Sequence, residues 1–275
     1  ETVTGTNATT DTVTMLATDD ITVRSIETVI GTTAATDVVR PLGGGTIAVS
    51  NVDTVISSTA GGDVVKMLGG GALAASGVET VLGTTGSADV LTLLGANAIA
   101  VSAVETVLGA TGGTDVVTML GGGSLAVSTV DTVRGSTGTD TVTMLGSGTL
   151  TVDIVERVIG TTGAGDVLNV LTAATVSVSG VETVLGSTGR DAAVFMGATT
   201  TLSVSNVETV VGGTGTGDVA QMLSGGAVSL SAIESVLGTT AAGDVAQMMS
   251  AGTLSVSNIE TVVGTASTVT SDVVR

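Results

Sequence analysis

The side chains in this sequence that could do chemistry are carboxylates, and they recur at a fixed spacing. In each copy of one unit an aspartate follows a stretch rich in Gly, Thr and Ala, as Asp115 follows Gly109–Thr114. Carboxylate oxygens beside the carbonyls of a turn could hold Ca²⁺, which prefers oxygen ligands in flexible geometry. The same carboxylate could instead cap its own turn by accepting backbone N–H hydrogen bonds. Both interpretations stay open here, and the aspartates that would bind calcium are Asp37, Asp63, Asp89, Asp115, Asp140, Asp166, Asp191, Asp218 and Asp244.

A second acid recurs in an (I/V)-(E/D)-(T/S/R)-V element, for example Glu105. Its copies are 26 residues apart throughout, except for 25 between Asp131 and Glu156, and the two acidic columns hold 22 of the 25 acids. If each unit were one coil, unit charges about 5 Å apart would repel by roughly 1 kcal/mol in water. Such a column favours cations as neutralising partners, although we expect the glutamates to be solvated and to point outward.

The amino-acid composition excludes most catalytic machinery. The chain has no His and no Cys, which removes histidine bases, cysteine nucleophiles, zinc ligation and disulfides. Two carboxylates could still act as acid and base, but a catalytic pair should be unique, whereas these acids recur in every unit. We therefore predict that the protein is not an enzyme.

Charge and hydropathy limit the partners. Against 25 acids the chain has seven Lys and Arg, which gives a net charge of −18, so we expect no nucleic-acid partner. Mean hydropathy is +0.63, which argues against a disordered acidic tail. Gly, Thr or an acid interrupts every apolar run, so the sequence predicts no membrane-spanning helix.

The fold follows from self-similarity, which covers the whole chain. Each 26-residue unit has three short runs rich in β-branched residues, as at Val104–Leu108, Val116–Leu120 and Leu125–Val127, separated by turn residues. The pattern predicts an all-β, right-handed parallel β-solenoid of about eleven 26-residue coils with three strands each. Hairpins of a β-sandwich would not keep one register over ten units. We expect residues 1–275 to form a single repeat solenoid, a processed product or a segment of a longer chain.

Alternation along the second run predicts which side chains face inward. Val117 and Met119 should point to the core and Thr118 to solvent. By the same parity the columns of Val116 and Val107 would face outward, although both are rich in Val. Either the corners break the parity or a neighbouring molecule covers an outer face.

The segment GSTGTDTV at Gly135–Val142, and above all Gly138-Thr139-Asp140 with Val142, resembles the calcium-binding β-roll repeats of the repeats-in-toxin (RTX) family, whose pattern is G-G-x-G-x-D-x-apolar-x. The resemblance implies calcium held between stacked turns by the Asp carboxylates, in secreted bacterial toxins, enzymes and surface proteins. The (I/V)-E-T-V-x-G element is similar to stretches that flank such repeats in very large bacterial surface proteins.

These observations lead to one functional expectation and one alternative. We expect a structural extracellular module, secreted or at the bacterial cell surface, that self-associates end to end and laterally into a filament, a surface layer (S-layer) or an adhesin stalk. Apolar outer columns and the lack of recognisable capping segments favour association. The alternative is a calcium-responsive RTX-type module of a secreted effector.

Overall fold

The structure is a computed structural model that describes residues 1–6, 10–33, 36–58, 61–86, 88–197 and 201–265, and the backbone of 273–274. These residues form short β-strands and no helix, so none could cross a membrane as an apolar helix. The chain divides into two compact units, Glu1–Gly138 and Thr139–Arg275, which are described one at a time. A single solenoid over residues 1–275 stays a prediction.

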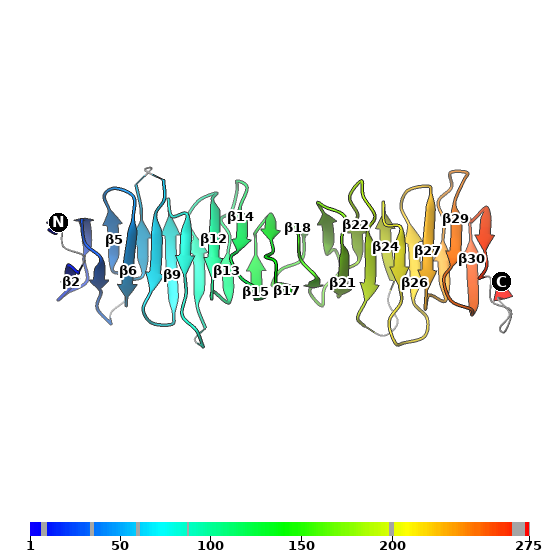
Figure 1. The fold of residues 1–275 in the computed structure, drawn as a ribbon, viewed down its shortest axis with the longest axis horizontal. Coiled ribbons are helices and arrows are strands. Elements are labelled where there is room, and N and C mark those ends of the chain that lie inside the picture. The colour runs from blue at the N-terminus through cyan, green and yellow to red at the C-terminus, as the bar shows by residue number, and fades with distance from the viewer. Residues whose placement is uncertain are drawn as a thin grey trace. The chain divides into compact units, whose positions relative to one another are not determined.

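In the first unit the chain winds between two parallel sheets, and successive strands alternate between them (Figure 1). One sheet has the order β1 (Thr2–Thr4), β3 (Asp20–Arg24), β5 (Val38–Pro41), β7 (Thr54–Ile56), β9 (Ala72–Ser76), β11 (Val90–Leu93), β13 (Thr106–Leu108) and β15 (Gly123–Ser128). The other has the order β2 (Thr12–Thr14), β4 (Thr28–Ile30), β6 (Thr46–Ser50), β8 (Val64–Met67), β10 (Thr80–Leu82), β12 (Ala98–Ser102), β14 (Val116–Met119) and β16 (Thr132–Arg134).

The second unit repeats this arrangement. One sheet has the order β17 (Asp140–Met144), β19 (Arg157–Ile159), β21 (Thr175–Ser179), β23 (Ala192–Phe195), β25 (Thr209–Val211), β27 (Ala227–Ser231), β29 (Val245–Met248) and β31 (Thr261–Val263). The other has the order β18 (Thr149–Asp153), β20 (Val167–Val170), β22 (Thr183–Leu185), β24 (Thr201–Ser205), β26 (Val219–Met222), β28 (Ser235–Leu237), β30 (Thr253–Ser257) and β32 (Val273–Val274).

The parallel β-solenoid is confirmed, but eleven coils of three strands each is wrong. Each turn closes after two strands, one in each sheet. Paired residues are mostly 20, 18 or 16 residues apart, as in Thr2 with Thr22, Thr22 with Arg40, and Val38 with Thr54, and they are 17 apart on both sides of β23. Each 26-residue repeat contributes three strands, so it makes one and a half turns. The right-handed sense of the coil stays a prediction.

Because a repeat contains three strands and a turn contains two, successive repeats alternate between the sheets. The strand that follows the aspartate of the Gly-rich stretch, such as Asp115, lies in one sheet as β5 and β11, and in the other as β8 and β14. Equivalent positions in one sheet are therefore three turns apart, about 14 Å at the usual strand spacing. This exceeds the screening length of about 8 Å at physiological salt. Among the described residues, equivalent carboxylates therefore do not stack every 5 Å, which was the expected reason for cations.

The burial of the side chains shows whether the predicted alternation of inward-facing and outward-facing residues continues through the corners. Val117 and Met119 are buried, as predicted, and Val116 is half-buried on the outer face. Val107 is fully buried, with half-buried Thr106 and Leu108 on either side. The corners therefore break the parity, and the Val107 column belongs to the core. The core is built from Val, Leu, Ile, Met and Ala, and the single phenylalanine, Phe195, fills a position that is Met119 in another repeat.

Candidate functional site

Three kinds of connector succeed one another along each edge of the coil, and each is named here from one copy. The glycine loop, Gly95–Asn97, joins β11 to β12. The aspartate loop, Gly109–Asp115, joins β13 to β14 in the next turn. The acid corner, Thr129–Asp131, joins β15 to β16 in the turn after that. The Asp at the end of the aspartate loop is called the loop aspartate, and the acid at the end of the acid corner is called the corner acid.

The loop aspartate is a buried acceptor that connects two connectors. Asp115 is fully buried, and its Oδ1 accepts a hydrogen bond from the N–H of Asn97 at 3.0 Å. Its Oδ2 accepts one from the N–H of Ala110 at 2.7 Å, within its own loop. Where Thr follows the first glycine of the loop, its hydroxyl donates as well, as Thr161 Oγ1 does to Asp166 Oδ2 at 2.8 Å. Both carboxylate oxygens are engaged in this way in Asp37, Asp89, Asp115, Asp166, Asp191 and Asp244.

The backbone of the same aspartate binds the acid corner of the following turn. The N–H of Asp115 donates to Asp131 Oδ2 at 2.7 Å, and the N–H groups of Asp131 and Thr132 donate back to the Asp115 carbonyl. We call this arrangement, which spans three successive turns, a clasp. The pairing of loop aspartate and corner acid recurs in Asp37–Asp53, Asp63–Glu79, Asp89–Glu105, Asp115–Asp131, Asp140–Glu156, Asp166–Glu182, Asp191–Glu208, Asp218–Glu234 and Asp244–Glu260.

The first residue of the aspartate loop is glycine because the clasp leaves no space there. A Cβ on Gly109 would lie 2.3 Å from the Thr129 carbonyl oxygen and 2.7 Å from Asp115 Oδ2. Gly83 and Gly160 meet the same two groups, with the corner carbonyl at 1.9 Å in each case. A side chain at this position must therefore push the loop away from the carboxylate and from the next corner.

Hydrogen bonds set the electrostatics of the clasp where a pKa shift is resolved. The Thr239 hydroxyl, followed by the Thr239 N–H, holds the pKa of Asp244 below its ordinary value of 3.8, against the opposing effect of burial. On the exposed face, Arg40 forms an ion pair with Asp20 at 2.8 Å and lowers the pKa of that carboxyl.

All nine aspartates that the sequence singled out are buried, and each contributes its backbone N–H to a clasp. The hydrogen bonds are those of turn capping, extended to two neighbouring turns. The corner acids are not simply solvated, since their carboxylates accept these N–H groups. Within the described part of the chain, no group of three or more His, Cys, Asp or Glu is placed to hold a metal. Calcium binding by these aspartates stays a prediction.

Sequence reasoning missed two features of this surface. The first is a set of exposed apolar residues that follow the strand after the loop aspartate; we call them the leucine rows. Leu16, Leu68 and Leu120 follow strands of one sheet of the first unit, and Leu42 and Leu94 follow strands of the other. In the second unit the rows contain Leu145, Leu171, Leu223 and Met249. The sequence feature that could have revealed these rows is the apolar residue that recurs just before each glycine loop.

The second missed feature lies in the third repeat. Ser57 and Ser58 stand where Gly109 and Ala110, or Gly and Thr, stand in other repeats. Aligning the repeats would have exposed this departure from an otherwise constant glycine. No family model, curated protein or solved structure matches this chain.

Proposed function

We propose that the chain is a structural β-solenoid module, secreted or at the bacterial cell surface, that associates laterally through its leucine rows in a filament, surface layer or adhesin stalk. The observation that carries the proposal is the exposure of the rows. Leu68, Leu94 and Leu120 each expose about half of their surface at 48–53%. Apolar side chains that stay exposed in a regular series mark contact surfaces more often than isolated ones do.

The period of the rows supports association between copies of the same chain. In the first unit, members of one row are three turns apart, about 14 Å. Two copies that lie side by side have the same period, so one register matches every contact along the rows. The net charge of −18 opposes this contact, and salt should therefore strengthen it by screening. End-to-end association stays an expectation from the sequence.

The experiment compares the full chain with Leu94→Gln/Leu120→Gln by analytical ultracentrifugation and electron microscopy, over a concentration series at low and high salt. Thr46→Gln/Ser124→Gln is the matched control, because both residues are exposed and lie outside the rows. We expect wild type and control to assemble, more so at high salt, and the double leucine variant to remain monomeric. A wild-type chain that stays monomeric throughout would overturn the proposal.

Two further outcomes are informative. Assembly of the double leucine variant at wild-type concentrations would assign the contact to another surface and contradict the role of the rows. A chain that stays monomeric and folds only when CaCl₂ is added would favour the calcium-responsive module of a secreted effector.

A further inference from the structure

The loop aspartate of the third repeat, Asp63, keeps its backbone pairing with Glu79, but one of its carboxylate oxygens lacks a donor. Asp63 exposes only 3% of its surface, yet its Oδ2 has no hydrogen-bond partner. The hydroxyl oxygens of Ser57 and Ser58 are also buried and unpartnered. In Asp89, by contrast, Oδ2 accepts hydrogen bonds from both the N–H and the hydroxyl of Thr84. Buried polar atoms are almost always satisfied, so three orphaned oxygens in one loop indicate a missing ligand.

The cause is Ser57, the residue that replaces the first glycine of the aspartate loop. The equivalent residue of the next repeat is Gly83. A Cβ on Gly83 would lie only 2.7 Å from Asp89 Oδ2, so no side chain fits there without a shift. A serine there separates the loop from the carboxylate, so the Ser58 N–H does not replace the donor that Thr84 supplies. The corner residue of the next turn is Gly77, whose own Cβ would approach the Ser57 carbonyl to 2.9 Å, so the backbone remains crowded.

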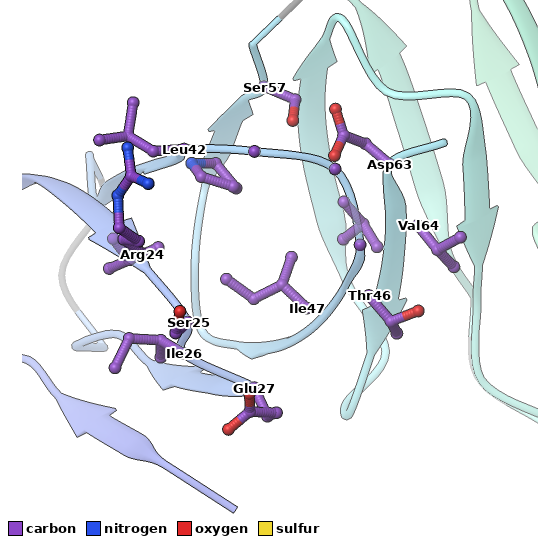
Figure 2. Close-up of a pocket in the computed structure, with 16 residues that line it drawn as sticks. Arg24, Ser25, Ile26, Glu27, Leu42, Thr46, Ile47, Ser57, Asp63 and Val64 are labelled. Atoms are coloured by element: carbon purple, nitrogen blue, oxygen red, sulfur yellow. The ribbon is translucent and has the colours of Figure 1, made fainter. Parts of the chain in front are cut away.

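Two of these residues, Ser57 and Asp63, line a cavity of about 280 Å³. Its other walls come from the acid corner around Ile26 and from the glycine loop 43–45. Figure 2 shows the Ser57 hydroxyl and the Asp63 carboxylate facing one another at one end, with Arg24 on the opposite side. A water molecule occupies about 30 Å³ of liquid, so the space accommodates an ion with part of its hydration shell.

We propose that Asp63 and Ser57 form a single hard-cation site in the third repeat. A carboxylate and a hydroxyl are oxygen ligands of the kind that Ca²⁺ accepts, with water completing the coordination. A bound cation compensates a buried charge that otherwise lacks a partner. The six loop aspartates with both carboxylate oxygens engaged differ, since those oxygens already accept N–H or hydroxyl donors. The proposal therefore predicts that the whole chain binds one ion, at the third repeat, and not one ion at each repeat.

The test is isothermal titration of the full chain with CaCl₂ in a potassium chloride background. Ser57→Gly and Asp63→Asn are the test variants, and Asp19→Asn, an exposed acid, controls for the change in charge. We expect wild type and the control to bind one Ca²⁺ that each test variant binds at least tenfold more weakly. Ser57→Gly keeps the carboxylate, so its loss of binding separates this site from general attraction of cations to an acidic protein.

A second readout is independent of the titration. Without calcium, Ser57→Gly should raise the midpoint of urea unfolding above that of wild type, because Asp63 Oδ2 can then accept the loop hydrogen bonds that it lacks. Adding CaCl₂ should raise the midpoint of wild type but not that of Ser57→Gly. No calcium-dependent heat or midpoint shift in wild type, as expected if water alone fills the cavity, would overturn the proposal. So would a stoichiometry and affinity that are the same in wild type and both test variants.

Discussion

At the scale of single residues, the acid corner requires a left-handed backbone at its first position. Asn51, Asn206 and Asn258 have φ of 51–55° there, and Gly77 and Gly180 have φ of 65° and 64°. Asn and Gly tolerate this conformation, whereas a β-branched residue is strained in it. Ile154 adopts it with φ of 55° while exposing 53% of its surface, so burial does little to offset the strain.

We therefore expect Ile154→Asn to stabilise the protein by about 1 kcal/mol, because Asn relieves the left-handed strain. The free energy of unfolding in urea measures the effect. Asn206→Ile, the reverse change at an equivalent corner, should destabilise by a similar amount. An Ile154→Asn variant less stable than wild type would show that the isoleucine makes contacts that outweigh the strain.

A second residue-scale prediction concerns pH. The pKa of Asp244 is lower in the folded state than its ordinary value of 3.8, so the clasp stabilises the protein fully above that value. The stabilisation is lost as the pH falls through the folded pKa. Thr239→Val removes the hydroxyl donor, so its deficit in unfolding free energy should be present at pH 6 and shrink below about pH 4. Thr253→Val, at an exposed position, is the control. A Thr239→Val deficit that is constant with pH would contradict the assignment.

The sequence predicted part of the residue-scale chemistry. Capping of a turn by its own aspartate is visible from the Gly-rich loop that precedes Asp115. The hydrogen-bond partners in neighbouring turns, the donor Asn97 and the acceptor Asp131, were not predictable, because they lie 18 and 16 residues away and come close only in the observed register. The consequence of Ser57 was hidden for the same reason, since the clash involves a carbonyl of the next turn.

At the scale of elements, the clasp ties together connectors that no strand joins directly. Asp115 accepts hydrogen bonds from the glycine loop of the preceding turn and from its own loop, and its backbone pairs with the acid corner of the following turn. Adjacent turns are thus linked at their corners as well as through their strands. Removing one loop aspartate should weaken three turns together.

We expect Asp115→Ala to destabilise the protein more than Glu105→Ala. The first change leaves the N–H groups of Asn97 and Ala110 without acceptors, at about 1–3 kcal/mol for each. The second frees only the Asp89 N–H, and water can replace the exposed Glu105 carboxylate. Unfolding free energies in urea provide the comparison, and Asp115→Asn should fall between wild type and Asp115→Ala. Equal losses for the two alanine variants would contradict the three-turn role of Asp115.

The strands themselves were predictable, but the closure of the turn was not. The run Val116–Leu120 corresponds to β14 and the run Leu125–Val127 lies within β15. Periodicity identifies which side chains alternate, but it does not fix how many strands complete a turn. Three strands and three corners fit a triangular coil as well as one and a half turns of a two-sheet coil. The two kinds of coil place Val107 differently. The sequence alternation predicted that it faces outward, whereas the two-sheet coil buries it fully.

At the scale of the whole molecule, the core is built from a few aliphatic residue types and contains almost none of the large aromatic residues usual in globular proteins. Each unit packs Val, Leu, Ile, Met and Ala between two sheets, and Phe195 is the single aromatic side chain of the chain. Protein interiors are close-packed, and here the same few aliphatic residue types recur at equivalent core positions along each unit. The stack is therefore tolerant of exchanges such as Met119 for Phe195, while its corners, with their glycines and acids, tolerate less.

The one-and-a-half-turn repeat also constrains how such a sequence can change in length. Gain or loss of one 26-residue copy by unequal recombination would move every later strand of the same unit into the opposite sheet. Residues that had lined one side, including the members of a leucine row, would then line the other. Only exchanges of two copies, 52 residues together, preserve which side each position occupies. The heritable building block of this solenoid is thus a pair of repeats, even though its sequence repeats singly.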